Sequence, residues 1–348
     1  MIDFRYHLVS IVAVFLALAI GIVLGSTELQ GPAFSLLDKT TSKLQNELGQ
    51  VSSQRDIAQQ QATEGEMYAQ AVEPAVLHNL LTGHRLLIVT EPGAQSTVVS
   101  GITAAAIHAG ATVTGQINLQ PKFFDSSGTA QDSLNQTTLA VAQPTGLQLD
   151  ASATYQQQAA QLIASEILTS APGSAAGAPG GSQGTSTDAS TMLQAYAASQ
   201  FLSTSGQPGT SASLAVVVTP QTAPSDGSAD QLAQVLVPVV QELAAKSAAT
   251  VVVGSSAGSG AGSPIAVLRS NNVSSRVSSV DDADLAAGQT VAMQALAMEV
   301  AGGKAGSYGF TANGATAIAP SPAPTPSASA SATPISSSST TKKKKAGQ

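Results

Sequence analysis

The chain has 348 residues, of which 43% are hydrophobic, 10% are charged and 3% are aromatic, and it contains no cysteine or tryptophan. The absence of cysteine excludes disulfides, thiolate metal sites, iron–sulfur clusters and cysteine nucleophiles. The net charge is −7 although four of the 14 cationic residues form the run Lys342 to Lys345, so the body of the chain is acidic and lacks the basic face of a nucleic-acid-binding protein.

An uncharged apolar segment lies close to the N-terminus. Residues 8–25 read LVSIVAVFLALAIGIVLG, and at about 1.5 Å per residue a helix of this length spans roughly 27 Å, close to the thickness of a bilayer's hydrocarbon core. The segment is longer than the hydrophobic region of a cleavable signal peptide, so we predict an uncleaved signal anchor. Arg5 precedes it and Glu28 follows it. The positive-inside rule therefore places residues 1–7 in the cytoplasm and the bulk of the chain outside the cytoplasmic membrane.

A heptad pattern of apolar residues follows the anchor and predicts a coiled-coil stalk over residues 33–73. Two apolar tracks, offset by three and four residues, supply the predicted oligomerisation contacts: Phe34, Leu37, Leu44, Leu48 and Val51. Arg55 and Gly65 interrupt these tracks in the second half, and Pro74 predicts that the helix ends at the residue before it. We therefore expect a homo-oligomer that associates through the stalk, with a single solvated amphipathic helix as the alternative.

Short apolar runs alternate with helical patterns from Arg85 onward, and this alternation is typical of β-α-β units. The expected strands are residues 85–90, 111–119, 213–219 and 249–254, and the expected helices are residues 97–108, 154–169, 189–202, 230–246 and 287–301. The continuous valine runs favour parallel strands that are covered on both faces. We therefore predict a doubly wound, mostly parallel α/β (Rossmann-like) head domain over residues 80–312.

Two segments are too rich in Gly, Ala, Ser and Pro to bury a core. Residues 171–187 predict a flexible surface insertion in the head, and residues 319–348 predict a disordered tail that ends in the lysine run. Outside the membrane these lysines would face wall polymers or anionic lipid headgroups, or would simply keep the tail soluble.

One pentapeptide matches an enzyme motif. Residues 254–258 read GSSAG, which fits the G-x-S-x-G nucleophile elbow with Ser256 as the nucleophile. All four histidines lie upstream of Ser256, whereas that hydrolase architecture places its histidine downstream. A chain rich in Gly, Ser and Ala also matches this motif by chance. We therefore predict that the protein is not an enzyme.

The same Gly-rich loop, residues 254–262, could expose backbone amides to an anion. It lacks the G-x-G-x-x-G spacing and the Lys-Ser or Lys-Thr pair of nucleotide-binding loops. The sequence therefore predicts no organic cofactor, and an ordinary connecting loop is the favoured interpretation.

Ligands for a soft metal are few. Beyond the initiator, the methionines are Met67, Met192, Met293 and Met298. Copper(I) prefers thiolates and thioethers, but Met293 and Met298 lie five residues apart and do not share a helical face, so both are expected to fill the core. His78 and His84 could form an imidazole pair at the junction of stalk and head, although solvated histidines are the favoured interpretation. These two histidines and these two methionines are the candidate metal ligands.

The densest carboxylate cluster is Asp281, Asp282 and Asp284. Carboxylate oxygens suit hard cations, but the spacing and the closing glutamate of an EF-hand are missing. One of these aspartates is expected to cap the helix that begins near Leu285.

The N-terminal segment MIDFRYHLVSIVAVFLALAIGIVLGSTELQGP resembles the N-terminus of the actinobacterial family that is named for mycobacterial copper transport protein B. The similarity continues through the heptad stalk and covers roughly residues 1–318 without the insertion. Four head segments carry it, in this order: LLIVTEPGA, AGATVTGQINL, SSVDDADLAAGQ and GGKAGSYGFTANG.

The resemblance implies a role in copper homeostasis in the cell envelope, and it alone suggests copper as a ligand. The family is sometimes described as an outer-membrane channel, while related members are linked to cell separation through control of peptidoglycan hydrolases. One helix cannot enclose a pore, and the chain lacks the repeated strands of a membrane barrel. Two hypotheses follow. The chain is an oligomeric, non-catalytic envelope component in copper homeostasis or transport, or it is a membrane-anchored coiled-coil scaffold that binds or regulates a peptidoglycan-remodelling partner in cell separation.

Overall fold

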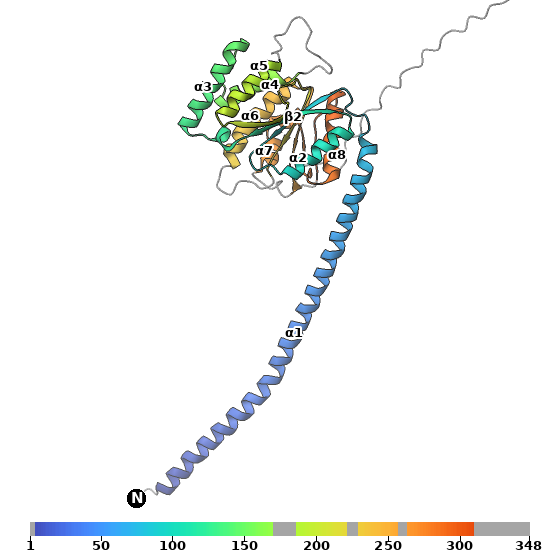
Figure 1. Cartoon of the computed structure of the whole chain (residues 1–348). Coiled ribbons are helices and arrows are strands. Elements are labelled where there is room, and N and C mark those ends of the chain that lie inside the picture. Colours follow the sequence, from blue (N-terminus) through green and yellow to red (C-terminus); the bar gives the residue numbers. More distant parts are fainter. Residues whose placement is uncertain (1–3, 170–185, 221–228, 257–262, 310–348) are drawn as a thin grey trace, which may run out of the picture. The chain divides into compact units, whose positions relative to one another are not determined.

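The computed structural model describes residues 4–169, 186–220, 229–256 and 263–309 (Figure 1). The expected tail lies outside these ranges, as do residues 171–185 of the expected insertion and residues 257–262 of the Gly-rich loop. The chain divides into two compact units, residues 1–71 and residues 72–348.

A single helix, α1 (Phe4–Leu77), accounts for the described part of the first unit. Its segment Arg5–Gly25 has a mean hydropathy of 2.9 and is long and apolar enough to cross a membrane. The N-terminal apolar helix predicted from the sequence is therefore present. The helix continues past Pro74 to Leu77, so the prediction that it ends at residue 73 is wrong.

The last turn of α1 belongs to the second unit and stays helical because the head packs against it. Leu77 is fully buried in the core of the head, as is Leu81 just after the helix. Burial of one leucine contributes about 1.5–3 kcal/mol. Two such residues offset the roughly 3 kcal/mol cost of a proline inside a helix.

Seven strands of the described chain form one sheet in the second unit, in the order β3-β2-β1-β4-β5-β6-β7. They are β1 (Arg85–Thr90), β2 (Thr112–Leu119), β3 (Leu202–Gly206), β4 (Leu214–Val218), β5 (Ala249–Val253), β6 (Ser278–Val280) and β7 (Ser307–Tyr308). All neighbouring pairs are parallel except β2 and β3, which are antiparallel. The predicted mixed α/β class with a mostly parallel sheet is confirmed.

Helices pack on both faces of this sheet (Figure 1). They are α2 (Ser96–His108), α3 (Gly128–Thr145), α4 (Tyr155–Ile167), α5 (Ser186–Ala198), α6 (Ala229–Lys246), α7 (Pro264–Ser270) and α8 (Ala286–Val300). Side chains along β1 alternate between two apolar clusters: Leu87 lies in the cluster with residues of α3 to α7, whereas Leu86 lies in the cluster with residues of α2 and α8. Two 3-10 segments, Pro121–Phe124 and Asn272–Ser275, are also present.

The sequence patterns missed α3 and the strands β3, β6 and β7. Helix α3 is largely polar, but both of its ends have capping residues that a sequence can indicate. The side chain of Ser127 accepts a hydrogen bond from the Ala130 N–H at the start, and Gly146 adopts a φ of 67° at the end. The strands β3 and β6 read LSTSG and SSV. Their place in the sheet is decided by neighbouring strands more than by the propensity of their residues.

Candidate functional site

Polar side chains follow four neighbouring strands at the carboxyl edge of the sheet. Glu91 comes after β1, Thr219 after β4, Ser255 after β5 and Asp281 after β6. In open parallel sheets, ligands bind at this edge where the strand order reverses. Strand β1 lies between β2 and β4, so the reversal falls beside Glu91. This edge is the first candidate site.

Glu91 is the least expected residue at this edge, because its side chain is only 2% exposed. Its backbone N–H donates to the carbonyl oxygen of Val218, 3.0 Å away, which holds the residue between β1 and β4. Within the described chain neither carboxyl oxygen has a hydrogen-bond partner. Burial raises the pKa of Glu91 to about 8, so the carboxyl group is protonated at neutral pH.

A buried ion pair stabilises the far end of the same edge. The Arg269 guanidinium lies 2.6 Å from the Asp281 carboxylate, and both side chains are almost entirely removed from solvent. Arg269 also donates to the Ser279 hydroxyl and to the carbonyl oxygen of Tyr308, at 2.9 and 2.8 Å. One arginine on α7 therefore connects β6 to β7. The sequence patterns did not predict a partner for Arg269, although a cation in a short apolar helix indicates a buried ion pair.

The prediction that an aspartate caps α8 is wrong. Leu285 is the N-cap residue, and it makes no side-chain capping bond. The aspartates have other roles, because Asp281 pairs with Arg269 and Asp284 accepts hydrogen bonds from Ser256. Burial, together with the charge of Asp281, raises the pKa of Asp282 to about 6.

Among the described residues, the hydrogen-bond partner of Ser256 is the carboxylate of Asp284 and not a histidine. Its hydroxyl donates to Asp284 Oδ2 over 3.1 Å, and its backbone N–H donates to Asp284 Oδ1 over 3.0 Å. These two bonds tie the start of the Gly-rich loop to the loop after β6. In the described part of the chain the Ser256 hydroxyl thus contacts a carboxylate, whereas a nucleophile elbow pairs its serine with a histidine.

The described histidines of the head each contact a different residue. His78 Nε2 lies 2.9 Å from the amide nitrogen of Asn79, and His84 Nδ1 lies 3.2 Å from the Ser213 hydroxyl. Burial lowers the pKa of His84. The imidazole pair of His78 and His84 stays a prediction.

His108, at the end of α2, makes the contact that sequence reasoning missed. Its Nδ1 lies 2.8 Å from the carboxylate of Glu73, which is 6% exposed. Glu73 stands near the end of α1, 35 residues earlier in the sequence. The pair connects the last turns of α1 with the head.

The methionines of the head lie on both faces of the sheet. Met293 is fully buried in the cluster beside α2 and α8, and Met298 packs against the same cluster. Met192 is buried in the cluster on the other face of the sheet. Among the described residues, no group of three or more His, Cys, Asp or Glu could hold a metal ion. Met293 and Met298 thus lie in or against the apolar core, and their candidate role as metal ligands stays a prediction.

Glu299 on α8 is a second buried acid that the sequence did not single out. Its carboxylate accepts hydrogen bonds from the N–H and hydroxyl of Ser278 and from the N–H of Thr250, at 3.0, 2.6 and 3.2 Å. Burial raises its pKa to about 7 even though these bonds lower it. Glu299 therefore satisfies backbone donors at the amino ends of β5 and β6, opposite the Glu91 edge.

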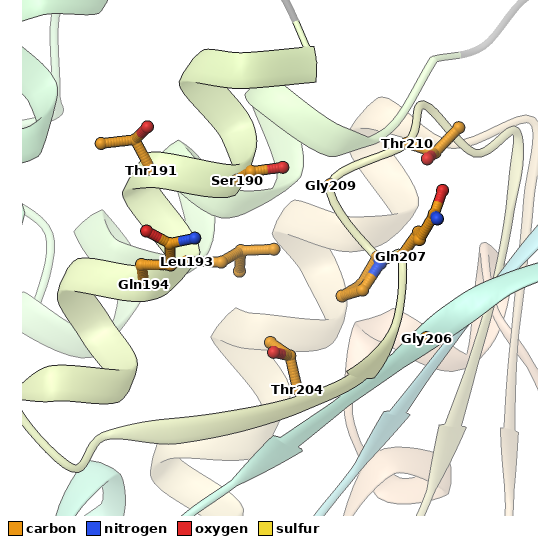
Figure 2. A pocket seen from close by; sticks show the side chains of 10 residues that line it. Ser190, Thr191, Leu193, Gln194, Thr204, Gly206, Gln207, Gly209 and Thr210 are labelled. Atoms are coloured by element: carbon orange, nitrogen blue, oxygen red, sulfur yellow. The ribbon is translucent and has the colours of Figure 1, made fainter.

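A pocket of about 540 Å³ lies at the outer edge of the sheet, beside β3. Figure 2 shows that α5 forms one side of it and that β3 and the following loop form the other. Its lining comprises Ser190, Thr191, Leu193, Gln194, Thr204, Gly206, Gln207, Pro208, Gly209 and Thr210. The lining is uncharged and mostly hydroxyl or amide in character. This pocket is the second candidate site.

The predicted oligomerisation residues lie on α1. The side chains of Leu44 and Leu48 are 53% and 68% exposed in the single chain, and Leu37 and Val51 are similarly exposed. The side chain of Phe34 lies outside the described residues. The homo-oligomer stays a prediction.

An apolar N-terminal helix followed by a mixed α/β unit with a mostly parallel sheet defines a membrane-associated α/β protein. The family model described as "Copper transport outer membrane protein, MctB" matches residues 1–320. The chain belongs to this family.

Curated relatives in mycobacteria carry the name Copper transporter MctB. The relatives from Mycobacterium tuberculosis and Mycobacterium bovis are 26% identical over 320 residues, which cover 91% of this chain and 99% of the relative. The relative from Mycobacterium leprae is 26% identical over 324 residues with the same coverage. The similarity therefore spans both the apolar helix and the head.

Proposed function

We propose that the chain is a single-pass protein of the cytoplasmic membrane that acts in copper homeostasis as a non-catalytic, oligomeric component of the cell envelope. The observation that carries this proposal is the extent of the family match, which runs over residues 1–320 and so includes the membrane helix and every described element of the head. The chain therefore has both parts, the apolar helix and the head, that a role of the family could require.

The proposed topology places residues 1–7 in the cytoplasm and the head outside. The basic Arg5 before the apolar segment and the acidic Glu28 after it support this orientation. A cysteine placed in the head should then react with a membrane-impermeant maleimide in intact spheroplasts, and the chain has no cysteine of its own to interfere. Labelling only after lysis would contradict this orientation and would place the head in the cytoplasm.

A coiled-coil stalk is part of the proposal. Large apolar side chains at heptad spacing on α1, such as Leu44 and Leu48, are more than half exposed in the single chain. Their burial against a second α1 would remove apolar surface from water, at about 25 cal/mol for each Å².

The head is proposed to be a Rossmann-like recognition module. Its support is the strand order with β1 next to β4, and the helices on both faces. A non-catalytic role is favoured because Ser256 contacts Asp284, and the histidines His78, His84 and His108 contact residues other than Ser256. Copper handling by this head would then be indirect, or would use ligands shared between copies of the chain.

Deletion of the gene tests the proposed function. We expect lower tolerance to copper and a higher cellular copper content, both restored by the full chain but not by a chain that lacks residues 1–25. Unchanged tolerance and unchanged copper content would contradict the copper role.

The scaffold hypothesis is the second candidate, and the exposed apolar track on α1 favours it, since a partner's helix could cover that track as well as a second copy could. It predicts that the deletion strain forms chains of unseparated cells. Normal septation together with copper sensitivity would contradict the scaffold and leave the copper role.

A further inference from the structure

The last turn of α1 depends on contacts with the head, because a proline weakens it from within. Pro74 has no N–H, so the helix lacks the backbone bond that would run from this residue to the preceding turn. Leu77 is fully buried in the core of the head, and the Leu81 N–H donates to the carbonyl oxygen of Ala109, 2.8 Å away. Both contacts are uncharged, so neither responds directly to pH.

Glu73 adds a charged contact to the same turn. Its side chain is 6% exposed, and within the described chain its carboxylate has one partner, His108, whose Nδ1 lies 2.8 Å from Oε1. A carboxylate that has been removed from water is stabilised only by the groups that bind it, and removal of its counter-charge is costly. The charge on His108 therefore decides how well Glu73 is accommodated.

His108 can change its charge without leaving this contact. Its side chain is 40% exposed, so the ring exchanges protons with the solvent while Nδ1 stays beside the carboxylate. An imidazole ordinarily changes its charge between about pH 5 and pH 8. The charged ring supplies an ion pair as well as a hydrogen bond, whereas the neutral ring can supply only the bond. The end of α2 also favours a cation at this position.

The other titratable groups of the surrounding elements have partners of their own or lie apart from this pair. Strand β2 and the rest of α2 contain no titratable side chain. Glu299 on α8 binds backbone and hydroxyl groups at the start of β5 and β6, and His84 contacts the Ser213 hydroxyl. In the part of the chain that the structure describes, neither Glu73 nor His108 forms an ion pair with the remaining neighbours, His78, Arg85 and Lys304.

We propose that Glu73 and His108 form a pH-sensitive latch between the last turn of α1 and the head. Acidic pH charges His108 and closes the latch. A rise in pH removes that charge and leaves the buried carboxylate beside a neutral ring, so the turn opens more often while the sheet stays folded. The latch depends neither on the role in copper homeostasis nor on the oligomer.

Hydrogen exchange of the full chain in detergent micelles tests the latch. The readout is the protection of the amides of residues 75–81 at pH 5.5, 6.5 and 8, with each rate divided by that of an unfolded chain at the same pH. The amides of β5 provide the reference for global unfolding. Because a hydrogen bond to a charged group is stronger than a neutral one, we expect protection to fall about fivefold between pH 5.5 and pH 8, relative to β5.

Three variants assign the effect to the pair. His108→Gln keeps a donor beside Glu73 but carries no charge, so its protection should not vary with pH and should match that of the wild type at pH 8. Glu73→Gln removes the carboxylate and should also abolish the pH dependence. His78→Gln is the matched control, since this exposed histidine just after α1 contacts Asn79, and it should keep the full dependence.

The proposal is overturned if the wild-type protection of residues 75–81, relative to β5, is equal at pH 5.5 and pH 8. It is also overturned if either His108→Gln or Glu73→Gln keeps the wild-type dependence; each of the two is sufficient if the other does not fold. Loss of the dependence in His84→Gln together with its retention in Glu73→Gln would assign it to His84, and this result overturns the latch as well.

Discussion

At the scale of single residues, we expect the head to be most sensitive to substitution at the buried ion pair of Arg269 and Asp281. Their side chains are 6% and 0% exposed, and the guanidinium also binds Ser279 and the backbone of Tyr308. Removing one member of a buried pair leaves an uncompensated charge that water cannot reach. This arginine therefore stabilises the last two strands of the sheet.

Replacement of Arg269 by methionine should lower the free energy of unfolding by about 3–5 kcal/mol. The measurement is urea unfolding of the full chain in detergent, followed by near-ultraviolet circular dichroism of the buried Tyr196. Lys43→Met is the matched control, because its pair with Glu47 is exposed and contributes about 0.3–0.5 kcal/mol. Equal effects of the two substitutions would contradict the role of the buried pair.

Glu91 makes the stability of the head dependent on pH. Its pKa is about 8 in the folded chain against an ordinary value of 4.5. Between these two values the folded state keeps a proton that the unfolded state releases. The stabilisation that protonated Glu91 contributes is therefore fully present below about pH 4.5. It is lost as the pH rises from there to about 8, by up to about 1.4 kcal/mol per pH unit. Asp282 and Glu299 act in the same direction over narrower ranges.

The Glu91→Gln variant tests this dependence, because glutamine fills the same space and has no proton to release. We expect the variant to lose stability more slowly than the wild type between pH 5 and pH 8, and so to be the more stable of the two at pH 8. Unfolding free energies at pH 5, 6.5 and 8 provide the measurement. Glu64→Gln, on an exposed face of α1, is the control. Parallel pH profiles for wild type and Glu91→Gln would show that Glu91 ionises normally.

At the scale of elements, α1 has two contrasting parts. Its end is held by the head, where Leu77 is buried and Glu73 contacts His108. The middle of the helix exposes Leu44 and Leu48. An amphipathic helix of this kind gains its stability from the surface that covers its apolar side. The uncovered track is therefore where an assembly of copies should form.

Substitution of both Leu44 and Leu48 by aspartate should convert the proposed oligomer into a monomer, since two charges at core positions of a coiled coil cannot be buried. Sedimentation of the full chain in detergent measures the change in mass. Asn46→Asp adds a charge between the two leucines at an outward heptad position and should leave the mass unchanged. A monomeric wild type, or a variant that keeps the wild-type mass, would contradict the coiled coil.

At the scale of the whole molecule, the chain combines an apolar helix, a long polar continuation of that helix, and an α/β head. The family match extends over all three. Met293 is fully buried in the apolar cluster beside α2 and α8, and Met298 packs against the same cluster, so both side chains fill the core. A copper role of the molecule is therefore expected to be independent of these methionines.

A strain that carries Met293→Leu together with Met298→Leu should tolerate copper as well as the wild-type strain does. Leucine replaces methionine in a core at a cost of usually less than about 1.5 kcal/mol, so the head should still fold. The measurement is growth across a copper series, with protein levels matched by immunoblotting. Loss of tolerance at normal protein level would identify the methionines as copper ligands.

The sequence predicted the elements whose signals are local. The membrane helix and the strands β1, β2, β4 and β5 were visible because a run of apolar residues, or its period, is a property of neighbouring residues. The polar strand β3 and the three-residue β6 carry no such signal. Their strand conformation depends on hydrogen bonds to β2 and β5, which residues far apart in the sequence supply.

By itself, then, the sequence determined the apolar helix, the α/β class of the head and the scarcity of soft metal ligands, because length, period and composition decide these properties. The tertiary structure decided which polar groups are buried and with what they pair. Glu91 is protonated at neutral pH because the sheet and helices exclude water around it. Arg269 pairs with Asp281 because α7 packs beside β6. Burial and pairing depend on contacts between distant residues, which a pattern of neighbours along the chain does not specify.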